Sequence, residues 1–296
     1  MIILRLDGGL GNQMFQYAAA RRLSEKHLTS LKLDLSWFET QRLRQYRLRY
    51  FNIWEHLATS QEITTLIGRS TFHEQMFAKI GRRLGFRQSV AGFYQRGLVL
   101  KENQFHFDPH VLNAPYHVYM EGFWQSEKYF SDIADILRQE FTLKYPHTSI
   151  FPQILDAINN TSSVSLHVRR SDYVNDPNNR ILSACDLNYY KRAIAYISEH
   201  ITNPHFFVFS DDPDWVKQNL SIEFPITLVS DHNFPDYEEL SLMGKCQHNI
   251  IANSSFSWWG AWLNSKKNKT VVAPAKWFNN NDFNTKDLIP ETWIKL

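Results

Sequence analysis

The second half of the chain alternates short apolar runs with helical patterns, and this alternation restricts the fold more than any other feature. Five strands are predicted there, at 163–168, 205–210, 226–230, 248–253 and 269–274. Four helices are predicted between them, at 187–200, 212–220, 237–246 and 254–265. Such alternation indicates a parallel sheet that is covered on both faces. Ligands of such sheets bind at the carboxyl ends of the strands, so the polar residues at those ends are candidates for function.

The first half opens as strand, helix, strand and then loses a readable order between residues 40 and 100. The patterns predict strands at 2–6, 31–36 and 116–125, and helices at 12–27 and 126–143, the second capped by Ser126. The segment 144–153 is the best candidate linker. We therefore predict an α/β fold with two Rossmann-like domains, 1–148 and 149–296, that face a cleft.

Composition restricts the class of protein. The net charge of +2, from 32 basic and 30 acidic side chains, argues against a dedicated nucleic-acid binder. The 15% aromatic content suits a large core first and sugar faces second. Cys185 and Cys246 are interpreted as buried thiols in a reducing compartment.

No apolar run reaches the roughly 18–20 residues of a membrane span, and the first apolar run is too short for a signal peptide. We expect a cytoplasmic protein. The basic stretch 77–88 is a candidate for peripheral contact with the inner membrane, with a solvated helix face as the alternative.

The strand "VSLHV" ends in two arginines. Ser165, His167 and Arg169 share one face by the period of two, although a strand between helices should be apolar on both faces. A buried cation is costly unless an anion accompanies it, and guanidinium binds phosphate bidentately. Arg169 and Arg170 are therefore candidate ligands of a diphosphate. The alternative is a salt bridge to Asp172 or to another carboxylate.

Two other strand ends carry polar residues. After "HFFVFS" come Asp211, Asp212 and Pro213, an ordinary helix start that we favour over a metal-binding Asp-x-Asp formed by Asp212 and Asp214. Asp211 or Asp212 is also expected to face the cleft. The strand "HNIIAN" ends at Asn253, and Ser254 and Ser255 open a helix whose backbone N–H groups and hydroxyls suit phosphate. Trp258, Trp259 and Trp262 in this helix are expected to pack.

The loop "DGGLGNQ" after the first strand is a partial dinucleotide fingerprint. Gly9 and Gly11 match the first two glycines of the G-x-G-x-x-G pattern, but Met14 replaces the third. Asp34 stands where the ribose-binding acid of that pattern would be. A NAD-dependent oxidoreductase is therefore one alternative, and a non-catalytic sugar-binding protein is another. No facing pair of carboxylates can be assigned for a glycoside hydrolase.

Four motifs together, "GGLGNQMFQYA", "HVRRSDY", "FSDDPDWV" and "LMGKCQHNIIANSSFSWWGAWLN", resemble the bacterial α-1,2-fucosyltransferases of glycosyltransferase family 11. The likeness runs from about residue 3 to about residue 275. It implies a GT-B architecture, GDP-β-L-fucose as donor substrate, inversion at the anomeric carbon, and neither a metal nor a cofactor. It also implies a galactose-terminated glycan as acceptor, of the O-antigen type, linked through its 2-hydroxyl. A fucosyltransferase of other linkage is the alternative.

The resemblance also assigns roles to residues. Arg169 is the essential arginine beside the diphosphate and His167 approaches the guanosine. Phosphate oxygens are held at Ser254, Ser255 and the backbone of Phe256, and Glu239 stands where the family places an acid on guanine. Gly9 and Gly11 permit close backbone approach, while Asn12 and Gln13 offer hydrogen bonds to fucose or acceptor. The sequence itself does not identify the base that takes the acceptor proton. Its candidates are Asp172, Asp176 and Glu127 in predicted loops and Asp7 at the end of the first strand, with the orientation of Arg169 or Arg170 as the favoured role of Asp172.

Overall fold

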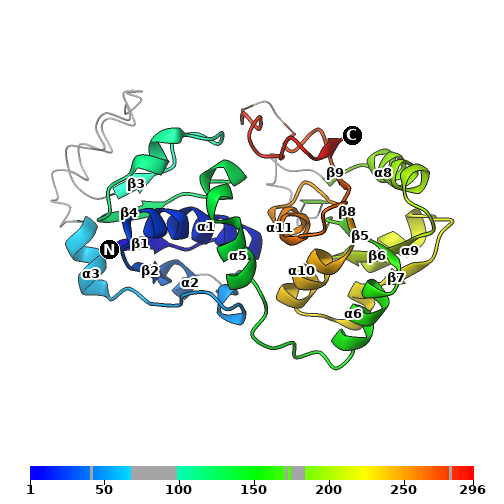
Figure 1. The fold of residues 1–296 in the computed structure, drawn as a ribbon, viewed down its shortest axis with the longest axis horizontal. Coiled ribbons are helices and arrows are strands. Elements are labelled where there is room, and N and C mark those ends of the chain that lie inside the picture. Colours follow the sequence, from blue (N-terminus) through cyan, green and yellow to red (C-terminus); the bar gives the residue numbers. More distant parts are fainter. Residues whose placement is uncertain (41–42, 68–98, 171–172, 175–183, 280–281) are drawn as a thin grey trace.

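The chain forms two parallel β-sheets, each with its own helices, that lie side by side along the long axis of the molecule (Figure 1). The computed structural model describes all residues except 41–42, 68–98, 171–172, 175–183 and 280–281. Among the described residues no helix has the length and apolar character needed to cross a bilayer. The basic stretch 77–88 lies outside the described residues.

The first sheet has the order β2-β1-β4-β3, and all of its pairings are parallel. Its strands are β1 (Ile2–Arg5), β2 (Leu31–Asp34), β3 (Val99–Lys101) and β4 (Val118–Glu121). Its helices are α1 (Leu10–His27), α2 (Ser36–Glu39), α3 (Ser60–Ile67) and α5 (Ala134–Glu140). The chain passes to the second sheet between α5 and α6 (Phe151–Asn159).

The second sheet has the order β7-β6-β5-β8-β9-β10, again with every pairing parallel. Its strands are β5 (Ser162–Val168), β6 (Pro204–Ser210), β7 (Ile226–Leu228), β8 (His248–Ile250), β9 (Val271–Ala273) and β10 (Ile294–Lys295). Counted from β5, this is the 3-2-1-4-5-6 order of the Rossmann fold, whose direction reverses between β5 and β8. Its remaining helices are α8 (Leu187–His200), α9 (Pro213–Asn219), α10 (Asp236–Lys245) and α11 (Ser255–Leu263).

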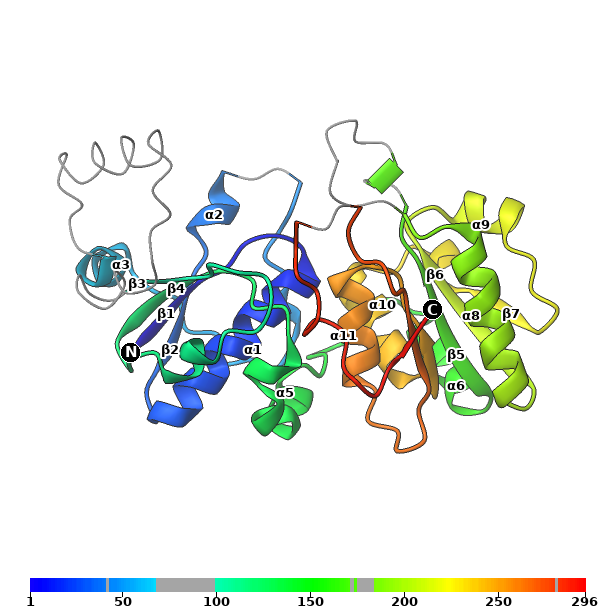
Figure 2. The ribbon, with the colours of Figure 1, turned by 90° about the horizontal axis from the view of Figure 1, so that it is seen from above.

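The two halves share one hydrophobic core, because α11 of the second half packs on α1 of the first (Figure 2). Phe15 of α1 lies 4.4 Å from Trp258 and 5.0 Å from Trp259, measured between ring centroids. Trp258, Trp259 and Trp262 are all buried, so the expectation that they pack is confirmed. The predicted α/β, GT-B-like pair of parallel sheets is also confirmed.

The last residues of the chain return to the first half. The Asp287 carboxylate accepts a hydrogen bond from the backbone N–H of Phe107 (3.1 Å) and pairs with Lys128 (2.6 Å). Leu288 and Trp293 join the shared core around Trp258. The domain boundary at 148/149 stays a prediction. The two sheets are separate, whereas one hydrophobic core and the C-terminal tail connect the two halves.

The structure corrects three details of the sequence analysis. The predicted helix 126–143 is wrong, because two 3-10 turns (Glu127–Tyr129 and Ser131–Ile133) precede the short α5. The break falls at Phe130, whose backbone (φ −149°, ψ 9°) is not helical and whose ring stacks on Trp259. Strand β10 was not predicted, and Cys185 is half-buried, unlike the buried Cys246.

Candidate active site

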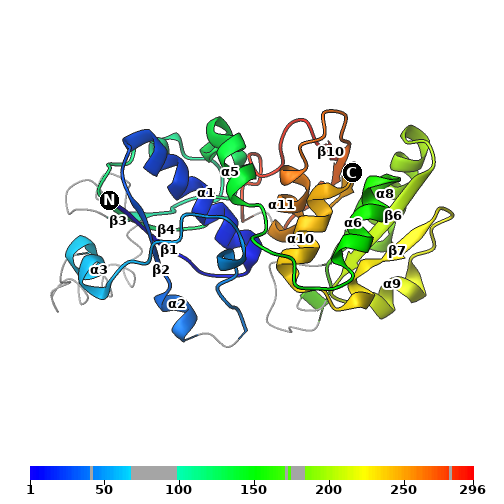
Figure 3. The ribbon, with the colours of Figure 1, turned by 60° about the horizontal axis from the view of Figure 1, so that its bottom comes forward.

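The site lies where the second sheet changes direction. Strands β5 and β8 are neighbours, so Arg169, just after β5, and Asn253, Ser254 and Ser255, just after β8, meet at the same edge. A cavity of about 540 Å³ opens there between the two halves. Figure 3 shows α1 of the first half beside α10 and α11 of the second.

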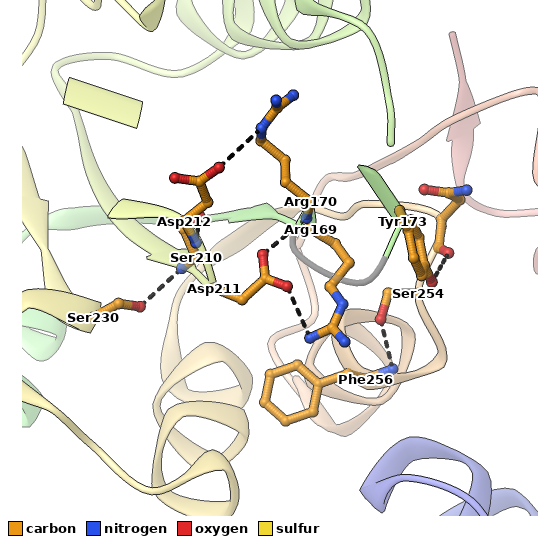
Figure 4. Close-up of polar contacts among 10 residues, drawn as sticks. Arg169, Arg170, Tyr173, Ser210, Asp211, Asp212, Ser230, Ser254 and Phe256 are labelled. Atoms are coloured by element: carbon orange, nitrogen blue, oxygen red, sulfur yellow. Dashed lines mark hydrogen bonds and ion pairs between the residues drawn. The ribbon is translucent and has the colours of Figure 1, made fainter. Parts of the chain in front are cut away.

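Arg169 is held in place by a carboxylate on the neighbouring strand end. Its Nη1 lies 3.2 Å from the Oδ2 of Asp211, which follows β6 (Figure 4). The other carboxylate oxygen of Asp211 accepts the backbone N–H of Arg170 at 2.8 Å. The Arg169 side chain is 24% exposed and lines the cavity, with the Tyr173 ring 5.7 Å from its guanidinium carbon. One carboxylate thus orients a guanidinium toward the cavity.

Arg170 points to the opposite side (Figure 4). Its Nε lies 3.3 Å from Asp212 and its guanidinium stacks over Trp215 at 4.0 Å. Asp212 caps α9 by accepting the backbone N–H of Trp215 at 3.1 Å, so the helix-cap interpretation is confirmed. None of Arg170, Asp211 and Asp212 lines the cavity. Asp211 acts on the cavity only through its ion pair with Arg169.

His167 lines the cavity from β5 and is buried. Burial, and then the Arg169 charge, lower its pKa to about 3, so the imidazole is neutral at physiological pH. Its ring lies 5.5 Å from that of Phe256. Its Nδ1 has no hydrogen-bond partner among the residues that the structure describes.

The start of α11 presents backbone donors to the same cavity. Ser254 is the N-cap, and its hydroxyl accepts the N–H of Phe256 at 3.3 Å. Asn253, Ser254, Ser255 and Phe256 all line the cavity. The Asn253 amide, however, serves the fold: its Nδ2 donates to the Trp277 carbonyl at 2.9 Å.

The glycine loop of the first half meets this helix start directly. A Cβ at Gly11 would lie 2.4 Å from the Ser255 carbonyl carbon and 2.5 Å from the Phe256 nitrogen. Asn12 bridges the halves, because its Oδ1 accepts hydrogen bonds from Ser255 Oγ (2.8 Å) and Gln125 Nε2 (3.0 Å). Gly9, Gly11 and Asn12 all line the cavity.

Gln13 is placed differently from its expected role toward the ligand. It is fully buried and does not line the cavity. Its Nε2 donates to the carbonyls of Gly8 and Gln45, and its Oε1 accepts the N–H of Arg47. The side chain therefore holds the segment 45–47 against the glycine loop.

The oxidoreductase alternative finds no support in the same loop. The Asp34 carboxylate accepts hydrogen bonds from Tyr119 (2.6 Å) and from the Ser36 backbone (2.9 Å). The close approach at Gly11 is to the backbone of Ser255 and Phe256, so this glycine serves a contact within the protein.

Glu239 lies near the carboxyl ends of β6 and β7 without lining the cavity. Its Oε1 accepts a hydrogen bond from Ser230 Oγ at 2.7 Å, and that oxygen accepts the N–H of Ser210. Burial raises the pKa of Glu239 to about 7, with smaller contributions from Asp236 and Asp211. Its carboxyl group therefore titrates near neutral pH.

The four candidate bases divide into two groups. Asp172 and Asp176 lie outside the described residues. Asp7 accepts a hydrogen bond from Gln16 Nε2 at 2.9 Å, and burial raises its pKa. Glu127 accepts the indole N–H of Trp262 at 3.1 Å. Neither Asp7 nor Glu127 lines the cavity.

The sequence analysis missed two groups of lining residues. Arg44 and Arg47 come from the segment 40–100, to which the patterns gave no order, and the arginine-rich run 42–49 was the available signal. Arg47 pairs with Asp236 of α10, Nε to Oδ1, at 3.4 Å. The second group is aromatic and consists of Phe105, Phe123, Trp277, Phe278 and Phe283.

Sequence comparison finds relatives that match nearly the whole length of the chain. The chain is 33% identical to an α-1,2-colitosyltransferase of Escherichia coli, in an alignment that covers all of this chain and 99% of the relative. It is also 33% identical, over 98% of its length, to 99% of the O-antigen biosynthesis glycosyltransferase WbnK of Escherichia coli. Human galactoside α-(1,2)-fucosyltransferase 1 is 26% identical over 49% of the chain and 42% of its own length.

Among solved structures, the fucosyltransferase NodZ from Bradyrhizobium covers 88% of this chain and 91% of its own, with 11% identity and a TM-score of 0.44. The model of Glycosyl transferase family 11 matches residues 99–296, which include both strand ends of the site and the tail that crosses between the halves. With this match and the two full-length relatives, the chain belongs to glycosyltransferase family 11 and is a glycosyltransferase.

Proposed function

We propose that the protein transfers L-fucose from GDP-β-L-fucose to the 2-hydroxyl of a terminal galactoside, with inversion and without a metal. The observation that carries the proposal is Arg169, aimed by Asp211 into a cavity at the β5/β8 switch point, beside the first turn of α11. The relatives named as galactoside α-1,2-fucosyltransferases and as O-antigen enzymes favour this acceptor class.

The charges of the cavity suit a diphosphate. The ionic side chains among its described lining residues are Arg44, Arg47, Arg169 and Asp236. Arg47 is paired with Asp236, and Arg169 with Asp211 outside the lining, so these lining residues present three guanidinium groups and one carboxylate. The start of α11 adds oriented N–H groups and the positive end of its dipole. A doubly charged diphosphate is complementary to this set.

The same groups explain how the donor bond breaks. As the bond to GDP lengthens, negative charge grows on the β-phosphate and the sugar becomes oxocarbenium-like. Arg169 and the N–H groups of the first α11 turn stabilise that charge. Donors fixed in advance toward developing charge contribute roughly 2.7–4 kcal/mol each where they have been measured. Asp211 keeps Arg169 from having to reorganise during the reaction.

Inversion requires the acceptor oxygen to attack from the face opposite to GDP, and a base to take its proton. Asp172 and Asp176 remain our candidates for that base, on the segment that follows Arg169. Neutral His167 and Asn12 line the same cavity and are candidates for hydrogen bonds to the donor.

The donor sugar has one close competitor. Colitose, the sugar named for one full-length relative, is fucose without its 3-hydroxyl. A site that hydrogen-bonds a hydroxyl rejects the analogue lacking it far more strongly than an apolar site rejects an extra hydroxyl. Comparing kcat/KM for GDP-fucose and GDP-colitose decides between the two donors.

The test of the proposal is GDP release from GDP-fucose in EDTA, with lactose and without it. Arg169→Lys keeps the charge but loses the planar fork, and we expect kcat to fall about 10²–10³-fold. Arg170→Lys, on the adjacent residue that stacks on Trp215, is the matched control and should fall far less. Lactose-dependent release that survives EDTA supports the proposal. Equal losses in both variants contradict the role of Arg169, and absence of GDP binding contradicts the proposed donor.

A further inference from the structure

One wall of the cavity is aromatic and is built by both halves of the chain. Phe105 follows β3 in the first half, whereas Phe278 and Phe283 follow β9 in the second. Their ring centroids are separated by 5.1 Å (Phe105 to Phe278), 5.8 Å (Phe105 to Phe283) and 4.7 Å (Phe278 to Phe283). We call these three rings the aromatic wall. Phe283 is 37% exposed, although it belongs to the residues that line the cavity.

The position of the wall follows from the order of the strands. Along the carboxyl edge of the second sheet, the residues after β6, β5, β8 and β9 are Asp211, Arg169, Asn253 and Trp277. Glu239 and Ser230 lie at the β6/β7 end of this edge, as their bonds to one another and to Ser210 show. The aromatic wall lies at the opposite end, after β9.

Local contacts fix the wall next to the phosphate-facing helix. The Trp277 carbonyl accepts a hydrogen bond from Asn253, the residue just before the α11 cap. On the other side, the Asp287 carboxylate accepts the N–H of Phe107, which ties the loop of Phe105 to the tail after Phe283. The rings are therefore positioned by both halves, within the same cavity as Arg169.

The chemistry of the wall differs from that of the rest of the cavity. The charged lining residues come from the segment 44–47, from the end of β5 and from α10, and none comes from the aromatic segments. Aromatic faces bind the C–H faces of pyranose rings, and they offer nothing to a phosphate. The galactopyranose ring collects its C–H groups on the face opposite its axial hydroxyl, which suits a flat apolar surface.

On the proposed function, we infer that the aromatic wall is the acceptor subsite and that Phe105 and Phe283 stack on the terminal galactose. GDP then occupies the edge from Glu239 to Ser254, and the galactoside enters from the β9 end. Because the rings come from both halves, the subsite is complete only when the first half and the tail 284–293 are seated together.

The experiment separates acceptor binding from donor binding. Phe105→Ala, Phe283→Ala and the double variant are compared with wild type for the lactose KM and for the Kd of GDP, measured calorimetrically. Because each stacked ring contributes to the binding energy of the galactoside, we expect the lactose KM to rise about tenfold in each alanine variant. The Kd of GDP should stay within about twofold of wild type. Phe283→Tyr keeps the ring and should restore most of the affinity. Tyr145→Ala, on a 75% exposed aromatic outside the cavity, is the control.

A binding measurement that needs no turnover completes the test. Saturation-transfer NMR with methyl β-D-galactoside and GDP should show transfer to the C–H protons on the face opposite the axial hydroxyl, weakened in both alanine variants. An unchanged lactose KM overturns the inference, and so does a loss confined to the Kd of GDP, since the wall would then hold the nucleotide. If wild type binds the galactoside but not GDP, the proposed donor fails while the acceptor subsite stands.

Discussion

The two halves of the molecule each begin a helix at the cavity, and the two helix starts differ in their use. The start of α11 is capped by the Ser254 hydroxyl and lies beside Arg169. The start of α1 has Gly9 as its N-cap, without a side-chain hydrogen bond, and Gly11 against the backbone of Ser255. The glycine loop thus resembles a phosphate loop in sequence, whereas Gly11 serves the contact between the halves.

The sharpest way to break this comparison is to add one methyl group at Gly11. In Gly11→Ala the Cβ would lie within 2.4–2.6 Å of the Ser255 and Phe256 backbone, which has no flexible side chain to move aside. Overpacking costs about 1–3 kcal/mol, more than the roughly 1 kcal/mol that alanine adds in a helix. We expect a lower free energy of unfolding and a loss of transferase activity larger than for any other substitution at this contact.

The matched control is Gly9→Ala, two residues away in the same loop. Its Cβ would meet only the Arg44 Nη1, at 3.8 Å. The cost should stay below about 1 kcal/mol, the size of an N-cap effect. Both variants are compared by urea denaturation and by GDP release. Equal destabilisation by the two variants would contradict a packing role specific to Gly11.

A double-mutant cycle on Asn12 and Ser255 sharpens the comparison from the polar side. Asn12 Oδ1 accepts from both Ser255 and Gln125, so Asn12→Ala leaves two donors without that acceptor. We expect a loss of about 1–3 kcal/mol in the free energy of unfolding. Ser255→Ala should lose less, and the double variant should lose less than the sum of the two.

Additive losses in that cycle would show that Asn12 and Ser255 act independently, contrary to a direct bridge between the halves. Activity measured on the same proteins separates the bridge from a contact to substrate. If Asn12→Ala lowers kcat more than its effect on stability explains, Asn12 also contacts the donor.

The sequence predicted the second half better than the first, for a physical reason. From β5 to β9, short apolar strands alternate with helical patterns, so local periodicity carries the signal of each element even where its packing partner is distant, as α1 is for α11. The helix expected at 126–143 breaks because Phe130 takes a non-helical backbone conformation and stacks on Trp259, which is distant in sequence. Strand β10 has two residues and depends on its pairing with β9.

The site shows the same division. Arg169, His167, Ser254 and Ser255 follow strands that were predicted correctly, so their meeting at one edge could be inferred. Gln13 was misplaced because its partners, Gln45 and Arg47, lie in a segment without readable order. The aromatic wall was missed because Phe105 and Phe283 meet only when the tail folds back across both halves.

Glu239 provides a pH test of where the nucleotide lies. We place guanine near this carboxyl, whose pKa is raised to about 7 mainly by burial. If binding needs the ionised form, the affinity for GDP-fucose should fall up to about tenfold for each pH unit below 7. The test uses GDP-fucose as the ligand, because GDP has a terminal phosphate that itself titrates in this range.

The measurement is the Kd of GDP-fucose at several values between pH 5.5 and 8, for wild type and Glu239→Gln. The variant should bind with a flat profile, since its amide does not titrate. A slope that is identical in both proteins would show that another group titrates, and guanine would then not be read by Glu239.

The smallest expected effect is on stability, and it concerns His167. Burial and the neighbouring Arg169 lower its pKa to about 3, so the folded protein holds it neutral. The unfolded chain takes up a proton below about pH 6.5, so lowering the pH favours unfolding throughout the window from about 6.5 to about 3. The resulting loss is about 1 kcal/mol at pH 6. Glu239 contributes with the opposite sign between about pH 4.5 and 7, because its pKa is raised in the folded state.

Comparison of wild type with His167→Gln cancels the contribution of Glu239. We measure the free energy of unfolding of both proteins with urea. As the pH falls from 7.5 to 5.5, wild type should lose more of this free energy than the variant. A difference that is constant over this range would mean that His167 gains its proton in the folded protein. A bound diphosphate would supply a reason for such a shift, so the same titration with GDP present shows whether His167 faces the nucleotide.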